Sequence, residues 1–311
     1  MNIIKRRIIW YILSSILVTY SIVAMVIWGI NPGADFTGGT LIGVGFNTYV
    51  SANDVRESIK DLGLQSLSVS ETGNNSVSIK TTTLERGEID EIISTLKTNL
   101  SQAPSLGVTS VEEKQVQVIG PTLGSDMTKK AIIAVCIAVV AIILYIAWSF
   151  RKVQRPFSSW SMSTATIIAL THDIIVVIGF VCTINHFYGF EADGYLLVAL
   201  LTILGFSVHD TIVVFDRIRE NLLRTASNIP VEKTIEDSIN QTLARSLNTS
   251  LTAILVLLAL ATIGGGAIRP FALTLLIGIA IGTYSSIFLA SPILVTWTNI
   301  RNKFSKKNNK E

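Results

Sequence analysis

Long apolar runs alternate with polar segments along the chain, and one polar segment is much longer than the others. A bilayer is crossed by about 20 predominantly apolar residues in a helix. The first run is longer than the core of a secretory signal and is followed by no small-residue cleavage site, so we expect it to remain as a helix. The pattern therefore predicts a polytopic α-helical membrane protein with six transmembrane helices, at Ile8–Ile30, Ala131–Phe150, Met162–Ile184, Gly194–Phe215, Leu247–Ile263 and Phe271–Trp297.

The long polar segment is Asn31–Asp126. Its stretches of periodic apolar residues, separated by turn-forming residues, are typical of a small folded domain. Period-two stretches predict strands, and periodic stretches with apolar positions three and four apart predict helices. The strands are expected at Thr40–Phe46, Leu67–Ser70, Val77–Lys80 and Val108–Val118, the helices at Asn53–Leu62 and Glu85–Leu100, and a hairpin turn at Thr72–Asn75. The order βαββαβ predicts a ferredoxin-like α+β domain inserted between helices 1 and 2. The expected division is therefore 1–30, 31–126 and 127–311.

Basic residues are distributed unevenly among the connecting segments. The N-terminus, the loop around Arg151, the 216–246 connection and the tail from Arg301 hold sixteen of the 25 Lys and Arg residues, whereas the loop 185–193 holds none. Loops rich in Lys and Arg stay in the cytoplasm. Both termini are therefore expected in the cytoplasm and the inserted domain outside it. Lys129 and Lys130 lie on the opposite side and weaken the pattern locally.

Composition narrows the function classes. The chain is 49% hydrophobic and 15% charged, against about 25% charged in soluble domains. Its two cysteines, Cys136 and Cys182, lie in apolar runs without metal-ligand spacing. Neither a zinc-protease motif, a nucleophile elbow, a phosphate loop nor a dinucleotide fingerprint is present, so we expect no cofactor and no metal. The basic tail indicates orientation and anionic-lipid contact rather than nucleic-acid binding.

The candidate chemistry consists of ionisable residues inside apolar runs. His172 and Asp173 fall in the third run, and His209 and Asp210 in the fourth. Such a residue costs about 2.5–3.5 kcal/mol to place at the centre of a membrane, and usually faces the bundle interior and handles ions or protons. Arg245 lies at the expected cytoplasmic entry of the fifth run and is either the cation that pairs with Asp210 or a topology anchor reaching the lipid headgroups. Asp210 itself is alternatively only a hydrogen-bonding residue between helices.

Three function classes remain open on these residues. A carboxylate held between burial and a nearby cation exchanges a proton when the cation moves, which makes a proton relay. Two intramembrane aspartates, Asp173 and Asp210, are also what an intramembrane aspartyl protease requires. A passive scaffold for assembly is the third class, and it would tolerate loss of the charge on Asp210.

Five blocks of sequence resemble the SecD/SecF family of the RND superfamily. The segment Gly33-Ala34-Asp35-Phe36-Thr37-Gly38-Gly39 is similar to the family signature after the first span, and the fourth-span block is highly specific. The other blocks follow in the family's order, at Leu170–Asp173, Gly205–Asn221, Asn240–Ser250 and Gly265–Leu294 with its Tyr284-Ser285-Ser286-Ile287-Phe288. The resemblance covers essentially the whole chain. One departure is His209, where the family often has Asn, so the part of His209 in a relay stays open.

The resemblance implies a non-enzymatic accessory subunit of the bacterial Sec translocon in the cytoplasmic (inner) membrane. Such a subunit has the architecture of one half of an RND transporter and pairs with SecD. With SecD it uses the ion-motive force, of H⁺ or Na⁺, to draw exported unfolded polypeptide out of the SecYEG channel after the SecA-driven stage; YajC is a further candidate partner. The resemblance also implies that Asp210 is the ion-responsive acid and Arg245 its partner. Asp35, Phe36, Gly38 and Gly39 would form the junction between membrane and soluble domain.

Overall fold

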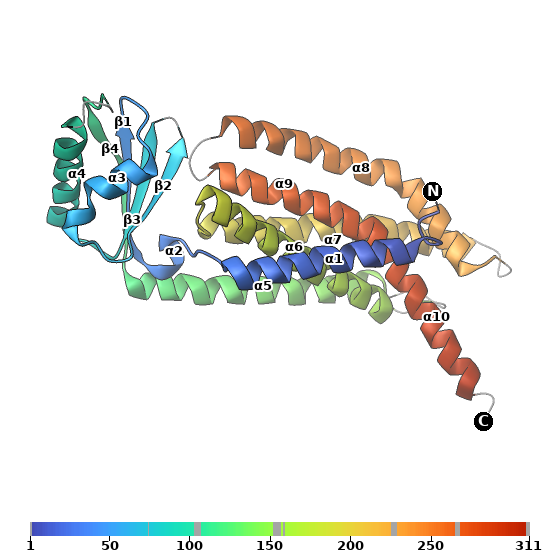
Figure 1. Ribbon diagram of the computed structural model, residues 1–311. Helices are drawn as coiled ribbons and strands as arrows, with labels where there is room; N and C mark the ends of the chain where they lie inside the picture. The colour runs from blue at the N-terminus through green and yellow to red at the C-terminus, as the bar shows by residue number, and fades with distance from the viewer. Residues whose placement is uncertain are drawn as a thin grey trace.

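A bundle of long helices and a small sheet domain at one end of it make up the molecule (Figure 1). The computed structural model describes residues 2–73, 75–102, 107–151, 157, 159–224, 229–264 and 268–308. Within these residues, six helical segments are long and apolar enough to cross a membrane. They are α1 (Arg7–Trp28), α5 (Pro121–Ser149), α6 (Ser159–Tyr188), α7 (Gly194–Arg224), α8 (Val231–Ile263) and α9 (Ile268–Ser285) with its continuation α10 (Ser291–Asn308).

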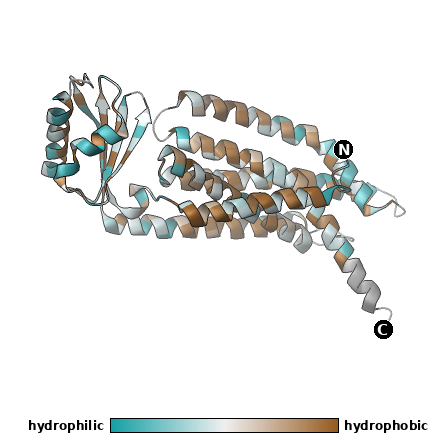
Figure 2. Cartoon of the chain, in the orientation of Figure 1, coloured by the Kyte–Doolittle hydropathy of each residue, from teal (hydrophilic) through white to brown (hydrophobic). Residues whose placement is uncertain are grey.

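The sheet domain contains four antiparallel strands in the order β2-β3-β1-β4. Its strands are β1 (Gly39–Phe46), β2 (Ser68–Gly73), β3 (Ser76–Thr81) and β4 (Val111–Ile119), and its helices are α2 (Ala34–Thr37), α3 (Ala52–Ser58), a 3₁₀ turn η1 (Lys60–Leu62) and α4 (Arg86–Ser101). Helices α3 and α4 lie on the side of the sheet that faces away from the bundle (Figure 1). Hydrophilic residues predominate in this domain, whereas the bundle helices are largely hydrophobic (Figure 2).

Alternation along the strands builds the core of the sheet domain. Ile42 and Val44 of β1 point to the helices and are fully buried, and Ile79 of β3 lies opposite Ile42 in the strand register. Ile89 and Ile92 of α4 are three residues apart, so they lie on one helix face and pack in the same cluster. Burial of these apolar side chains holds the two helices against the sheet.

Each predicted element of the polar segment corresponds to an observed one, with bounds displaced by one to three residues where strands and helices end. Asn74 of the predicted hairpin turn lies outside the described residues, while Asn75 beside it has a φ of 57°, a left-handed conformation that Asn tolerates. The chain leaves the sheet abruptly, because β4 ends at Ile119 and α5 begins at Pro121. Residues 121–126, predicted to belong to the polar segment, thus form the first turns of α5.

The helices of the bundle differ in how much of their surface the chain itself covers. The span of α9 and α10 is the most buried, followed by α6 and α7, whereas α1, α5 and α8 are mostly exposed. Two helices are also longer than their apolar runs, since α7 continues to Arg224 and α8 starts at Val231. Their polar ends pack against each other, with Asn221 donating hydrogen bonds to Ser238 and Gln241.

A single π-helical turn, Ser286–Ala290, joins α9 to α10. It lies in the middle of the last span, where the wider turn shifts the register of the following side chains. Turns of this kind inside α-helices are rare and occur mostly at functional sites. The side chains packed against this turn are therefore the first place to look for chemistry.

We predict that segment 31–126 folds on its own and that Ile79→Ala destabilises it by about 2–5 kcal/mol, because the side chain is fully buried and leaves a cavity. Urea unfolding of the separate segment, followed by circular dichroism, measures this. The neighbouring Ser78→Ala lies on the opposite face of the same strand and serves as the control, with a change within about 0.5 kcal/mol. A coil spectrum or a non-cooperative transition would contradict independent folding.

Candidate functional site

Asp173 is a fully buried carboxylate in the middle of the bundle. Its Oδ2 accepts hydrogen bonds from the hydroxyls of Ser207 on α7, at 2.6 Å, and Ser285 on α9, at 2.7 Å. Its Oδ1 lies 3.0 Å from Nδ1 of His172 on its own helix. A carboxylate accepts hydrogen bonds and cannot donate them, so two hydroxyls and an imidazole N–H are the partners that its ionised form needs. Asp173 thereby joins α6, α7 and α9.

Further hydroxyl groups continue from this carboxylate to the π-helical turn. Ser286, the first residue of the turn, hydrogen-bonds Thr211 of α7 at 2.8 Å and donates to the backbone carbonyl of Ser207 at 3.1 Å. Ser291 donates to the carbonyl of Ser286, five residues back. Small hydroxyl residues satisfy polar groups between membrane helices and let the helix backbones come close.

Asp210 lies one turn further along α7 and forms a second, separate cluster. Its side chain is buried, and Oδ2 accepts a hydrogen bond from Ser250 of α8 at 3.4 Å. Ser250 also hydrogen-bonds Thr283 of α9, so this cluster joins α7, α8 and α9. Ser246 and Ser250 are four residues apart, which places both on the face of α8 that packs inward.

Arg245 does not meet Asp210 in this structure. Both residues are described, and no ion pair joins them; Arg245 is exposed, as is His209. The reason is angular, since adjacent residues of a helix point about 100° apart. Ser246 faces inward and so turns Arg245 outward, and Asp210 does the same to His209. The pairing implied by the family resemblance is therefore not formed within the described part of the chain.

The two His-Asp pairs differ in what surrounds the histidine. His172 is buried, contacts Asp173, and has its ring 6.2 Å from that of Tyr284 on α9. Tyr284 in turn hydrogen-bonds Ser14 of α1 at 3.0 Å. The Nε2 atom of His172 has no hydrogen-bond partner among the described residues. The pair on α6 is thus an interior group, whereas in the pair on α7 only the aspartate is interior.

The two carboxylates share no hydrogen bond within the described residues. Asp173 and Asp210 each have their own hydroxyl partners, and no hydrogen bond joins them although both are described. An aspartyl protease needs two carboxylates close enough to share a proton. The described residues also contain no group of three or more His, Cys, Asp or Glu side chains that could hold a metal ion.

The junction residues after the first span are closely packed. Gly38 has a φ of 74°, and a Cβ there would lie 2.9 Å from Cα of Pro121; a Cβ on Gly39 would lie 2.5 Å from the carbonyl oxygen of Thr81. Phe36 is half-buried, and its carbonyl accepts a hydrogen bond from Thr128 of α5 at 3.3 Å. Only glycine fits these two positions, because no side chain has room and the left-handed φ favours Gly. Helix α2 is thus held against the first turns of α5.

Asp35 binds the beginning of another membrane helix. Its Oδ2 accepts a hydrogen bond at 2.8 Å from the backbone N–H of Gly194, the first residue of α7. Asp193 precedes that helix and accepts hydrogen bonds from Tyr195 and Leu196. Burial raises the pKa of Asp193, the nearby Asp35 carboxylate raises it further, and the helix N–H groups oppose both effects. Negative charge at a helix N-terminus is stabilised by the free N–H groups and the dipole.

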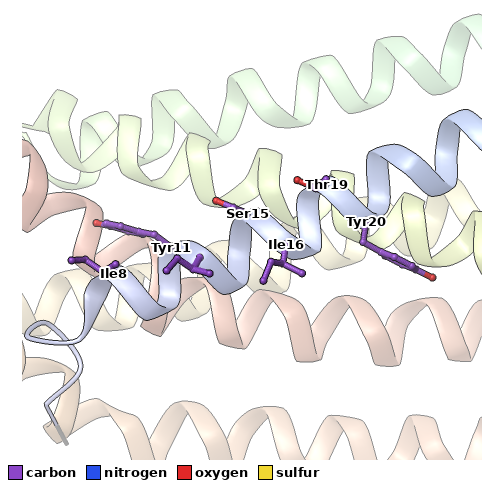
Figure 3. Close-up of a pocket in the computed structure, with 7 residues that line it drawn as sticks. Ile8, Tyr11, Ser15, Ile16, Thr19 and Tyr20 are labelled. Atoms are coloured by element: carbon purple, nitrogen blue, oxygen red, sulfur yellow. The ribbon is translucent and has the colours of Figure 1, made fainter.

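A hollow on the surface of α1 is unrelated to these groups. It has a volume of about 540 Å³ and follows one face of α1, where Ile8, Ile12 and Ile16 are more than half exposed (Figure 3). Tyr11 and Tyr20 border it, and their hydroxyls bond Thr296 and Thr183. No ionisable carboxylate lines it, and an exposed apolar face on a spanning helix is what the hydrocarbon of a bilayer favours.

Sequence reasoning identified the aspartates but missed their hydroxyl partners. Ser207 and Thr211, like Ser246 and Ser250, are spaced by four within apolar runs, which is a usable signal for a polar stripe on one helix face. The residues missed are Ser207, Thr211, Ser246, Ser250, Thr283, Ser285 and Ser286. Which stripe would face which aspartate depends on helix packing and could not be read from spacing.

Known proteins match the chain over most of its length. Residues 101–300 match the family model described as protein export membrane protein SecD/SecF, C-terminal. Proteins named protein translocase subunit SecF from Thermobaculum terrenum, Anaerolinea thermophila and Vibrio alginolyticus are 40%, 36% and 34% identical to it. These alignments cover 96%, 96% and 91% of this chain and 94%, 94% and 85% of the relatives.

Solved structures show the same fold within a longer chain. The crystal structure of SecDF from Thermus thermophilus, described as a translocon-associated membrane protein, superposes with a TM-score of 0.83 at 29% identity over 96% of this chain. A SecDF structure in a super-membrane-facing form gives 0.67 over the full chain. This chain spans 39% and 40% of those two chains. The family model, the relatives and the shared bundle lead to one conclusion: the chain belongs to the SecD/SecF family of protein-export membrane proteins.

Proposed function

We propose that this protein is a SecF-type accessory subunit of the Sec protein-export machinery. With SecD it would use the ion-motive force across the bacterial inner membrane to promote late steps of polypeptide translocation. The observation that carries the proposal is the buried Asp210 cluster, set in a chain 33–40% identical to proteins named as translocase subunits. The further proposed partners are SecYEG, SecA, YajC and the unfolded exported chain. The proposed function involves no enzymatic reaction.

Asp210 is the proposed ion-responsive acid. Its partners within this chain are hydroxyls, which can bond a protonated or an ionised carboxyl equally well because they donate and accept. Arg245 and His209 are exposed on the same two helices, α7 and α8. We propose that SecD covers these helices in the complex and brings Arg245 into the relay. The 39% share of the SecDF chain that this chain spans leaves room for such a second half.

Asp173 and His172 are the proposed second group of the relay. Both acids are connected to α7 and α9: Asp173 accepts hydrogen bonds from Ser207 and Ser285, and Asp210, which lies on α7, accepts one from Ser250 of α8, which also bonds Thr283 of α9. A change of charge at either acid would therefore act on the same pair of helices. One charge crossing 100 mV supplies about 2.3 kcal/mol, enough to bias two arrangements of these helices, but short of the ~5.5 kcal/mol that would hold them fully on one side.

For the domains we propose the arrangement 1–30, 31–126 and 127–311, with the middle segment a ferredoxin-like domain outside the cytoplasm and both termini inside. The observed order of elements, β1-α3-β2-β3-α4-β4, and the strand order support this class. The segment from Asp35 to Gly39 is the proposed junction that carries the domain on the bundle.

The first prediction from the proposed function concerns the orientation of the chain in the membrane. In a Cys136→Ala/Cys182→Ala background, a cysteine at Glu57 should react with an impermeant maleimide in intact cells, because Glu57 is exposed on the sheet domain. A cysteine at Arg224, exposed at the far end of α7, is the matched control and should react only after permeabilisation. Labelling in the opposite order would overturn the proposed topology.

The second prediction concerns Asp210→Asn, which keeps the size of the side chain but cannot change charge. The variant should insert and assemble normally, since a neutral amide is easier to bury than a carboxylate. Export driven by ATP alone should continue, and the part stimulated by an imposed H⁺ or Na⁺ gradient should be lost. Export by inverted vesicles with and without each gradient measures this.

Asp216→Asn is the control for that experiment, because Asp216 is exposed beyond the apolar part of α7. It should keep full gradient stimulation. Full stimulation in Asp210→Asn would contradict the relay and favour a scaffold. Loss of a cleavage product, from Asp173→Asn as much as from Asp210→Asn, would instead indicate a protease.

A further inference from the structure

The sheet domain touches the loop between α6 and α7 through a nearly buried ion pair. Nζ of Lys80, on β3, lies 3.2 Å from a carboxylate oxygen of Glu191, and the two side chains are only 14% and 15% exposed. Lys80 also donates a hydrogen bond of 2.6 Å to the carbonyl of Pro32. Among the Lys and Arg ion pairs of the described residues, each other pair is at least 32% exposed on one partner. Exposed pairs contribute little, whereas a mutation that removes one partner of a desolvated pair leaves the other charge unpaired while it is still buried, which is costly.

Backbone hydrogen bonds reinforce the same contact. The N–H of Gly33 donates to the carbonyl of Ala192 at 2.7 Å, and the N–H of Ala192 donates to the carbonyl of Asn31 at 2.8 Å, which forms a short parallel bridge. A Cβ on Gly33 would lie 3.0 Å from the Ala192 oxygen, so a larger residue would push the two segments apart. Asp35 adds its bond to Gly194 at the beginning of α7.

This contact differs from the one that α2 makes with α5, where the chain passes from the sheet domain into the bundle. There, α2 packs tightly on α5, and a Cβ on Gly124 would lie 2.5 Å from the backbone N of Gly38. The contact with the α6–α7 loop is instead made of an ion pair and hydrogen bonds. Water can replace such partners when two surfaces separate, so the net loss on opening is small.

We propose that Lys80, Glu191, the Gly33–Ala192 bridge and Asp35 form a latch that holds the sheet domain against the beginning of α7 and opens during transport. Opening would let the domain swing about the packed α2–α5 junction. Helix α7 carries both Ser207 and Asp210, so a shift of this helix at its ion-responsive acid reaches the latch through one rigid element. The proposal rests on the proposed function for what drives the opening, but the latch itself is testable without export.

A disulfide across the latch tests whether it must open. In the cysteine-free background, Ser70→Cys/Gly189→Cys joins β2 to the α6–α7 loop, since the Cβ of Ser70 lies 3.9 Å from the Cβ position at Gly189. That separation suits a disulfide. The full chain, assembled with its partner in vesicles, should lose gradient-stimulated export on oxidation and regain it on reduction.

Two controls isolate the bridge from other effects. Ser70→Cys/Ser78→Cys joins two partners in the β2–β3 register, so its disulfide stays inside the sheet domain and should leave export unchanged. Gly189→Cys alone reports any effect of a side chain at a residue with φ of 67°. Full gradient stimulation with the latch disulfide formed would overturn the proposal.

A labelling test reads the latch in the absence of export. Ala192 is 2% exposed, so a cysteine at that position reacts with an impermeant maleimide only while the latch is open. Adding Lys80→Gln should raise the labelling rate by at least about tenfold, because it leaves the nearly buried Glu191 carboxylate without its partner while the latch is closed. Lys80→Glu should raise it as well, and Lys80→Glu/Glu191→Lys should return it most of the way.

The two tests fail in different ways. A labelling rate that Lys80→Gln leaves unchanged would overturn the latch, whatever export does. Vesicles of the parent protein that show no gradient stimulation would count against the proposed function, while the labelling rates would still decide whether the latch exists.

Discussion

A carboxylate inside an apolar bundle is stable only if other helices supply its hydrogen bonds, and Asp173 imposes that requirement on this fold. Its partners come from α7 and α9, so these two helices must approach α6 closely and in a fixed rotation. Small residues make the approach possible, since a Cβ on Gly282 of α9 would lie 2.9 Å from the Cβ of Ser207. Removal of one partner would leave a buried charge incompletely solvated, which costs more than the loss of an ordinary hydrogen bond. The most buried span of the bundle is accordingly the one that carries Ser285.

Asp210 differs from Asp173 in what surrounds it. Asp210 accepts one hydrogen bond, from Ser250 at 3.4 Å, with the hydroxyls of Thr283 and Ser246 close by, while the side chains of His209 and Arg245 are exposed. The protonation state of a carboxyl with few short hydrogen bonds responds to a charge that a neighbouring subunit or an arriving ion brings close to it. Asp173 accepts hydroxyl hydrogen bonds of 2.6 and 2.7 Å, which are shorter than the 3.4 Å bond that Asp210 accepts. This difference supports the proposal that Asp210 is the group that changes state.

The parts of the fold that could be predicted from the sequence are those for which a physical constraint leaves a pattern of apolar residues. Apolar runs identify membrane helices because a bilayer requires them, and alternation found the strands of the sheet domain because its core covers only one face. The ends of the helices could not be predicted as well as their apolar runs. Helix α8 begins at Val231 and not at its apolar run, because polar residues stay helical where they pack on another helix. The pairing of Asp210 with Arg245 was expected from the resemblance, yet the rotation of α8 is set by Ser246 and Ser250 packing inward. The π-helical turn at Ser286 was not predicted, because the phase shift that an extra residue causes is hard to see in a span that is apolar on almost every side.

The π-helical turn begins where the last span contacts both α6 and α7. Ser285 and Ser286 are consecutive, and one bonds the Asp173 carboxylate while the other bonds Thr211 and the carbonyl of Ser207. In a regular α-helix, consecutive side chains diverge by about 100°, and holding both in one polar layer demands a local change of pitch. The turn is therefore where α9 adapts to α7. Helix α7 also carries Asp210 and begins at the carboxylate of Asp35, so one helix contacts the turn, holds the second acid and meets the junction segment.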